Sequence, residues 1–246
     1  MSLAIVTGAS SGIGAATAKL LTENGFEVIA AARRLERLEE LSRENPKIKA
    51  VKLDVTDQVS VDEFVKNLNG RGVSVLINNA GGAFDYISIE KAVPENWQKS
   101  YEVNVIGALR VTKALLPNLR ANGQSHIVVV TSTAGHGVYE NGGSYTSAKH
   151  AELAFAQTLR LELNGEPIRI TEIAPGMVKT EEFSLNRLGS KVAAEKVYEG
   201  VAEPLTAVDI AEAVRWSVTL PAHVNIDSLV IRPIAQAANH KVHRVK

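Results

Sequence analysis

The stretch TGASSGIG, residues 7–14, follows a short apolar run and precedes a helical pattern. Its glycines at positions 8, 12 and 14 let the chain turn tightly and let the backbone approach a ligand closely. The helix that begins there offers unpaired backbone N–H groups and the positive end of its dipole. The stretch predicts a strand, a loop that binds phosphate, and a helix; a plain connection between strand and helix is the alternative.

Alternating strand and helix patterns extend outward from this loop. Apolar runs of strand length lie at residues 3–8, 26–31, 48–55, 73–81, 126–132, 168–176 and 227–232. Helical patterns lie between them at residues 12–24, 35–44, 57–68, 94–121, 143–164 and 206–219. Strands that are apolar nearly throughout and separated by helices indicate a parallel sheet covered on both faces. We predict one α/β domain over residues 1–246, a doubly wound parallel sheet of about seven strands with helices on both faces.

Two segments do not fit the repeat. Residues 177–205 are more polar and lack a clear strand, which predicts an inserted flap, helical or loop-like, that contacts a ligand. Residues 233–246 have no obvious place in the sheet. We expect this tail to be frayed or to pack across a neighbouring subunit.

Composition excludes several function classes. Lys plus Arg equals Asp plus Glu at 27 each, so no charge excess indicates nucleic acid or an anionic membrane as a partner. The chain has no cysteine, which excludes disulfides and thiol nucleophiles, and its six histidines show no metal-ligand spacing. No apolar run reaches the ~18–20 residues of a membrane span, and the N-terminus has no secretory-signal pattern. We expect a cytoplasmic protein without a bound metal.

The end of the second strand reads AAARR, residues 30–34. An acidic residue at this point would bind the ribose 2′-hydroxyl of NAD, but Ala32 lies there, followed by Arg33 and Arg34. Guanidinium groups pair bidentately with a phosphate, and Ser10 supplies a further hydroxyl. The sequence therefore predicts NADP(H) rather than NAD(H), with two solvated arginines at a helix start as the alternative.

In SYTSAKH, residues 144–150, Tyr145 and Lys149 are four positions apart in a helical pattern. This spacing places both side chains on one helix face, where an ammonium favours the ionised form of a phenol. Exposed pairs with this spacing are common, so the spacing by itself does not separate an acid–base pair from a surface pair.

Seven motifs in order along the chain resemble those of the short-chain dehydrogenase/reductase family. After TGASSGIG they are LDV with Asp54, NNAG at 78–81, VNVIG with Asn104, TSTAG with Ser132, YTSAK with Tyr145 and Lys149, and APGMVKT ending in Thr180. The resemblance covers almost the whole chain and includes the spacing from Ser132 to Tyr145. It implies a single-domain Rossmann-type fold and an NADP(H)-dependent oxidoreductase.

The resemblance implies catalytic roles for four residues. Tyr145 would be the general acid in reduction and the base in oxidation, with Lys149 and the oxidised nicotinamide lowering a phenol pKa that is ordinarily about 10. Ser132 would donate a hydrogen bond to the substrate oxygen. Asn104 would bind a water that extends a proton relay from Lys149. The alternatives are a polar position on a helix for Asn104 and a cap or turn hydroxyl for Ser132.

The resemblance also implies how the chain holds NADP(H). Asp54 would contact the adenine, the backbone at 80–82 the adenosine ribose, and the segment from Pro175 to Thr180 the nicotinamide. The residues expected at the cofactor are Gly8, Ser10, Ser11, Gly12, Ile13, Gly14, Arg33, Arg34, Asp54, Val55, Asn79, Ala80, Gly81, Tyr145, Lys149, Pro175, Gly176, Val178 and Thr180.

The segment EEFSLNR and the C-terminal stretch from Leu205 to Gln236 look similar to a narrower group. That group contains NADP-dependent 3-hydroxy acid or serine dehydrogenases, sulfoacetaldehyde reductases and the aldehyde reductase of clavulanic acid biosynthesis. Its small polar, often anionic substrates would contact Ser132, Tyr145 and a cation, for which Arg187 is the first candidate, although a surface arginine fits equally. A reductase of a bulkier carbonyl and a non-catalytic NADPH-binding sensor remain as alternatives. The resemblance further suggests a homotetramer or homodimer built on helices 94–121 and 143–164.

Overall fold

Seven parallel strands form the central sheet of the structure, a computed structural model that describes residues 2–245. The strands are β1 (Leu3–Thr7), β2 (Glu27–Ala32), β3 (Ile48–Lys52), β4 (Val75–Asn78), β5 (Ser125–Val130), β6 (Ile168–Pro175) and β7 (Ser228–Ile231). Their spatial order is β3-β2-β1-β4-β5-β6-β7, so the winding direction reverses between β1 and β4. Ligands of doubly wound sheets bind at such a reversal, outside the carboxyl ends of the strands.

Alternate side chains of β1 enter two different cores. Leu3 and Ile5 pack in the cluster on one face of the sheet, whereas Ala4 and Val6 pack in the cluster on the other face. Successive residues of a strand point to opposite faces, so a sheet covered on both sides needs strands that are apolar throughout. Burying a large aliphatic side chain such as Ile5 contributes roughly 1.5–3 kcal/mol. The predicted α/β sheet is confirmed.

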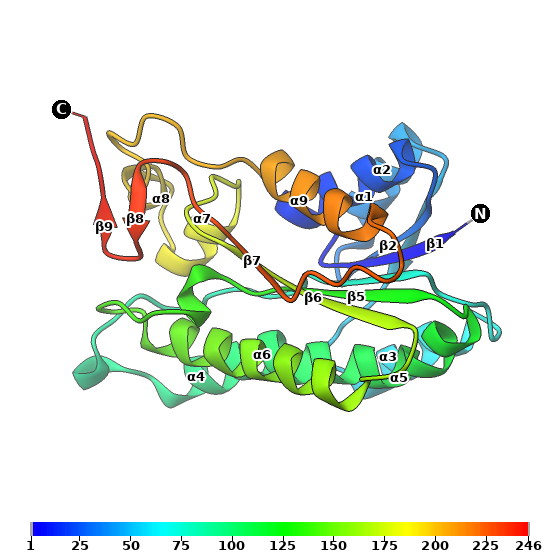
Figure 1. The fold of residues 1–246 in the computed structure, drawn as a ribbon. Helices are drawn as coiled ribbons and strands as arrows, with labels where there is room; N and C mark the ends of the chain where they lie inside the picture. Colours follow the sequence, from blue (N-terminus) through cyan, green and yellow to red (C-terminus); the bar gives the residue numbers. More distant parts are fainter. Residues whose placement is uncertain (1, 246) are drawn as a thin grey trace.

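Helices cover both faces of the sheet (Figure 1). One face carries α1 (Gly12–Glu23), α2 (Leu35–Glu44) and α9 (Ala207–Thr219); the other carries α3 (Gln58–Lys66), α4 (Pro94–Tyr101), α5 (Gly107–Ala121) and α6 (Gly143–Glu162). Local sequence sets where two of them begin. Thr206 and Asp209 form a reciprocal capping box at the start of α9, and Pro94 stands in the first turn of α4, where its missing N–H is not needed.

The single helix predicted over residues 94–121 is wrong in one respect. A π-helical turn, η2 (Glu102–Ile106), separates α4 from α5. Short π-helical turns of this kind occur frequently at functional sites. This one holds Asn104, whose side chain is fully buried. Two short 3₁₀ turns, η1 (Ile89–Lys91) and η3 (Thr133–Gly135), lie in the loops after β4 and β5.

The flap predicted at residues 177–205 contains two short helices, α7 (Phe183–Leu188) and α8 (Lys191–Lys196). It lies with the tail at the carboxyl end of the sheet, at the left of Figure 1. The tail forms a hairpin of β8 (Gln236–Ala238) and β9 (Lys241–Val242).

Our expectation of a frayed tail is wrong, because the tail packs on its own chain. Packing across a neighbouring subunit stays a prediction. The Gln236 side chain accepts a hydrogen bond from the backbone N–H of Met177 at 2.8 Å. Asn239 donates to the carbonyls of Thr133 and Gly137 at 3.0 and 2.8 Å. These side-chain amides satisfy backbone groups of the loops that they cover, which holds the tail over the site.

Candidate active site

In the glycine loop after β1, backbone segments pack so closely that side chains larger than hydrogen do not fit. Gly8 has a φ of +65°, a backbone conformation that residues other than glycine rarely adopt. A Cβ on Gly14 would lie 2.5 Å from the carbonyl oxygen of Gly8, so a larger residue would push α1 away from the loop. Asn79, at the end of β4, donates to the carbonyl oxygen of Thr7 at 3.0 Å and thereby braces the loop. The loop is thus held in a fixed shape, with Gly8, Ser10 and Ser11 half-buried.

A cleft of about 320 Å³ adjoins the loop at the ends of β1, β2 and β4. Nine residues predicted to bind the cofactor line it, namely Gly8, Ser10, Ser11, Arg33, Arg34, Asp54, Val55, Ala80 and Gly81. The Asp54 carboxylate accepts from the backbone N–H and the hydroxyl of Thr56, which fixes its orientation at the cleft wall. The structure therefore brings together the predicted adenosine half of the site.

Arg34 lies in a polar network that the sequence did not reveal. Its guanidinium binds both carboxylate oxygens of Glu182, at 2.6 and 2.7 Å, and donates to the hydroxyls of Ser10 and Ser11. The hydrogen bond from Arg34 holds the pKa of Glu182 below its usual value. Glu182 lies 148 positions away on the flap, so no local pattern marks this contact. A carboxylate thus occupies part of the cationic wall at which we predicted a phosphate.

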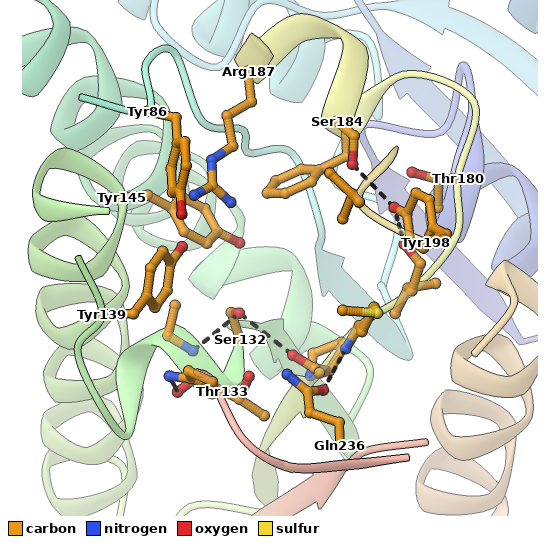
Figure 2. Close-up of a pocket in the computed structure, with 18 of the residues that line it drawn as sticks. Tyr86, Ser132, Thr133, Tyr139, Tyr145, Thr180, Ser184, Arg187, Tyr198 and Gln236 are labelled. Atoms are coloured by element: carbon orange, nitrogen blue, oxygen red, sulfur yellow. Dashed lines mark hydrogen bonds between the residues drawn. The ribbon is translucent and has the colours of Figure 1, made fainter. Parts of the chain in front are cut away.

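A second cleft, of about 420 Å³, lies between the sheet and the flap and contains both Ser132 and Tyr145 (Figure 2). Tyr145 is in the first turn of α6, and its ring packs edge-on against Phe183 of the flap with 5.4 Å between centroids. The Ser132 hydroxyl accepts from the backbone N–H of Ala134 at 3.1 Å, which caps η3 and directs the hydroxyl into the cleft.

Lys149 is buried behind Tyr145, with its Nζ atom 5.7 Å from the centroid of the tyrosine ring. The ammonium donates to the carbonyl oxygen of Val130 at 3.1 Å and to the Glu152 carboxylate at 2.5 Å. Burial acts to lower the pKa of Lys149, but attraction to Glu152, Tyr145 and Glu172 outweighs it and raises the pKa overall. The alternative of an exposed surface pair is therefore wrong.

Asn104 joins the same group of side chains. Its amide nitrogen donates to the carbonyl oxygens of Gly82 and Ser100, and its oxygen accepts from the N–H of Gly82. A Cβ on Gly81 would lie 2.5 Å from the Asn104 oxygen and 3.5 Å from the Lys149 Nζ atom, so only glycine fits between the two. Both N–H donors of the Asn104 side chain are used within the protein, so the water predicted here would have to donate to an oxygen atom of Asn104.

The other residues predicted to bind the cofactor either line the second cleft or support the backbone around it. Ile13, Pro175, Gly176, Val178 and Thr180 line the same cleft as Ser132 and Tyr145. Gly12 and Gly14 do not line either cleft and instead bring α1 close to its neighbours: a Cβ on Gly12 would lie 3.5 Å from the Thr180 side chain. Asn79, as described above, acts on the loop backbone.

Arg187, the cation predicted in the flap, points into this second cleft (Figure 2). Its guanidinium carbon lies 4.2 Å from the ring centroid of Tyr86 and 5.3 Å from that of Tyr139. It takes part in none of the ion pairs found among residues 2–245, and its Nε atom is buried without a hydrogen-bond partner. Burial raises the pKa of Tyr139 to about 12, which keeps that ring neutral. A half-buried guanidinium that packs on aromatic faces and has no acidic partner among residues 2–245 retains its capacity to bind an anion.

Sequence reasoning missed the other side chains of this wall. Tyr86 and Tyr139 come from loops after β4 and β5, and Gln236 comes from the tail. No periodic pattern or motif marks these positions. His136, considered as a substrate contact because it follows Ser132 closely, turns away from the cleft and hydrogen-bonds Glu172 at 2.8 Å.

Residues 2–245 contain no cluster of three histidine, cysteine or acidic side chains able to hold a metal ion. Within the same residues, no helix has the length and apolar character needed to cross a membrane.

Known proteins resemble this chain in sequence and in fold. An uncharacterised oxidoreductase of Mycobacterium tuberculosis is 48% identical over 237 residues, which cover 96% of this chain and 92% of the relative. The NADP-dependent 3-hydroxy acid dehydrogenase YdfG of Salmonella typhi is 38% identical over 98% of this chain and 99% of its own length. A solved structure, the closed form of serine dehydrogenase complexed with NADP⁺, superposes with a TM-score of 0.92 at 37% identity, covering 99% of this chain and 100% of that one.

The family profile described as short chain dehydrogenase matches residues 2–189, which hold the glycine loop, Ser132, Tyr145 and Lys149. This match and the full-length relatives confirm the family that the motifs predicted. The chain belongs to the short-chain dehydrogenase family.

Proposed function

We propose that the chain is an NADP(H)-dependent oxidoreductase that interconverts a carbonyl and an alcohol on a small, polar, anionic substrate. One observation carries the proposal: a single cleft contains Ser132, Tyr145 and a guanidinium, Arg187, that has no acidic partner among residues 2–245. The 3-hydroxy acid dehydrogenase and the serine dehydrogenase among the similar proteins favour a substrate that carries a carboxylate.

The cofactor fits the residues on both sides of the glycine loop. The close approach of Gly8 and Gly14 leaves loop backbone free to face a pyrophosphate, and the cleft beside it is lined by Arg33 and Arg34. Ala32 presents no carboxylate that would repel a 2′-phosphate. Of the three similar proteins described above, YdfG is NADP-dependent and the serine dehydrogenase structure is complexed with NADP⁺. When bound, NADP(H) supplies or accepts the hydride.

Four residues of the chain would handle the proton and the substrate oxygen. Tyr145 gives its phenolic proton to the carbonyl oxygen in reduction and takes it back in oxidation. Ser132 donates a hydrogen bond to the same oxygen and stabilises the negative charge that develops there. The ammonium of Lys149 favours the tyrosinate form. Asn104 holds the 81–82 backbone against Lys149 and offers an oxygen to a relay water.

Arg187 would bind the anionic group of the substrate. The aromatic faces of Tyr86 and Tyr139 hold the guanidinium without neutralising it, so its charge is available inside the cleft. A charge-assisted, bidentate contact fixes both distance and orientation, and this places the carbonyl at a set distance from Ser132 and Tyr145.

The bulkier-substrate alternative is less well supported. Tyr86, Tyr139 and Tyr145 make part of the cleft wall aromatic, so the character of the wall alone does not exclude an aromatic substrate. Its volume, about 420 Å³, must hold both the nicotinamide and the substrate. That space favours a substrate with few heavy atoms.

A panel assay tests the proposal. NADPH consumption is followed with small aldehydes and keto acids, and NADP⁺ reduction with serine, 3-hydroxy acids and 2-hydroxyethanesulfonate. We expect turnover to be concentrated on the anionic compounds. Turnover confined to neutral or bulky carbonyls would overturn the anionic substrate but keep the reductase. NADPH binding without turnover of any compound would support the sensor instead.

We further propose a homodimer or homotetramer, as the family resemblance suggests. Three large apolar side chains support contacts between subunits along α4, α5 and α6: Tyr101, Leu109 and Leu161, of which Leu161 is 77% exposed. Sedimentation equilibrium of the wild-type chain and of Leu161→Glu tests this, with a lower mass expected for the variant.

The cytoplasmic location expected from the sequence stays a prediction.

A further inference from the structure

A carboxylate lies in direct contact with the proposed catalytic lysine. Glu152, one turn after Lys149 on α6, is 1% exposed, and its Oε2 atom is 2.5 Å from the Lys149 Nζ atom. Glutamate is almost never fully buried unless it is paired. Here the pair itself is buried, because Lys149 is also only 4% exposed. The familiar motifs of the chain do not account for an acid at this position.

Stability alone is a weak reason for such a pair. Removing two charges from water costs several kcal/mol, and an apolar pair of similar volume often stabilises a fold equally well. We therefore ask what the contact does to the Lys149 ammonium. An ammonium has three N–H donors in a tetrahedral arrangement. Val130 accepts one and Glu152 a second, so the direction of the third is fixed.

Glu152 also changes the charge beside Tyr145. An isolated ammonium behind the phenol favours tyrosinate strongly, whereas an ammonium paired with a carboxylate favours it less. Burial raises the pKa of Glu152 to about 7, with Lys149 acting to lower it and Glu172 to raise it. Above this pKa the carboxylate carries its negative charge directly against the Lys149 ammonium.

The charges around the pair come from few elements. Glu152, Lys149 and Tyr145 lie on α6, and Glu172 on β6 acts on both Lys149 and Glu152. His136, after η3, hydrogen-bonds Glu172, as do the hydroxyls of Thr131 and Ser228. Glu172 therefore has its own partners, whereas Glu152 is bound to Lys149.

We propose that Glu152 is a positioning residue: it directs the Lys149 ammonium, offsets its charge, and thereby sets the pH range over which Tyr145 exchanges its proton with the substrate. The proposal rests on the roles proposed above for Tyr145 and Lys149. It differs from a structural role because it predicts a shift of the pH profile, which a packing contact alone does not produce.

The test is the pH dependence of kcat/KM for alcohol oxidation, with NADP⁺ and 3-hydroxypropionate or the most active alcohol of the panel. Oxidation needs tyrosinate, so activity falls on the acidic side as Tyr145 becomes protonated. Glu152→Gln removes a negative charge near the phenol, so we expect this acidic limb to move about one pH unit lower. The control is Glu162→Gln, an exposed residue at the end of the same helix, which should leave the limb in place.

An acidic limb of Glu152→Gln that coincides with that of the wild type would overturn the proposal. If this variant does not fold, Glu152→Asp replaces it, because its carboxylate keeps the charge but is one methylene further from Lys149. We then expect a lower kcat and a smaller shift in the same direction, and an unchanged kcat and limb would contradict the proposal. Tyr145→Phe separates the two hypotheses. Near-normal turnover by this variant would contradict the proposed function. If Tyr145→Phe is inactive and the acidic limb of Glu152→Gln is unshifted, only the role proposed for Glu152 is contradicted.

Discussion

The sheet with its helices and the flap with its tail form opposite walls of one site but are held together differently. Every residue of β1, β4 and β5 is buried, whereas Ser184 is the one buried residue within α7 and α8. Side chains on the sheet side, such as Asn104 and Lys149, are held by buried hydrogen bonds to backbone. On the flap side, Glu182 and Arg187 are held by a half-exposed ion pair and by aromatic faces.

The difference fits the two tasks proposed for the site. Buried hydrogen bonds would hold the proposed proton-transfer groups to the tolerance that catalysis needs. Exposed pairs are individually weak, in the range of about 0.2–1 kcal/mol, so side chains of the flap that are held by them are altered at low cost. We expect substitutions on the sheet side to change turnover or stability, and those on the flap side to change which ligand is bound.

The largest effect is expected at Tyr145. Replacing it by phenylalanine removes the proton donor but keeps the buried ring and its contact with Phe183. We expect kcat to fall by more than ~100-fold with little change in NADPH affinity. Steady-state kinetics and a fluorescence titration of NADPH on the same preparation measure the two quantities. Near-normal turnover by this variant would contradict the proposed role of Tyr145 as the proton donor.

Arg33→Ala should weaken NADPH binding much more than NADH binding. Arg33 lines the cleft beside the glycine loop, and a hydrogen bond to a charged group contributes about 1.5–3 kcal/mol, or roughly 10- to 100-fold in affinity. Titrations with both cofactors measure this. Arg43→Ala, an exposed arginine in the last turn of α2, is the control and should change neither affinity. Equal losses for NADPH and NADH would contradict the cofactor assignment at this wall.

His126, on β5, should make stability sensitive to acid. Burial and then the charge of Arg169 lower the pKa of His126 from 6.5 to about 3. Because the folded pKa is depressed, its contribution to stability is present above pH 6.5 and is lost as the pH falls toward 3. Near pH 5 this loss amounts to about 2 kcal/mol.

Urea unfolding at about pH 7 and 5 measures the effect of His126. We expect the pH dependence of the unfolding free energy to be about 2 kcal/mol smaller in His126→Gln than in the wild type. His240→Gln, in the exposed part of the tail, should behave like the wild type. Equal pH dependence in His126→Gln and the wild type would show that the sheet side is less closed to water than its burial indicates.

The smallest effect is expected at Glu182. This carboxylate and the 2′-phosphate would compete for Arg34, so Glu182→Gln should tighten NADPH binding about two- to fivefold. Glu181→Gln is a matched control, because the neighbouring carboxylate is largely exposed and does not touch Arg34. Weaker NADPH binding by Glu182→Gln would mean that the flap carboxylate assists the cofactor rather than competing with it.

The same contrast explains what the sequence could predict. Strands buried on both faces are apolar throughout, and the glycine loop follows the first of them. The sheet and the end of the site beside the glycine loop could therefore be predicted from the sequence. The bond from Arg34 to Glu182 spans 148 positions and that from Gln236 to Met177 spans 59, and no local pattern encodes either. The π-helical turn at Asn104 was missed because a helix period does not reveal one extra residue in a turn. Arg187 was predicted as a cation of the flap, but the aromatic faces that hold it were not.

The ratio of kcat/KM for succinate semialdehyde to that for butanal tests the central claim most directly, because these aldehydes share a carbon chain and differ in one carboxylate. The ratio is measured for the wild type, Arg187→Met and Tyr145→Phe. We expect the wild type to prefer the anion by at least ~10-fold, Arg187→Met to lose the preference, and Tyr145→Phe to slow both aldehydes equally and keep it. Two results would contradict the account: an Arg187→Met variant that slows both aldehydes equally, or a Tyr145→Phe variant that changes the ratio. Either would mean that catalysis on the sheet side and substrate selection on the flap side are not separate.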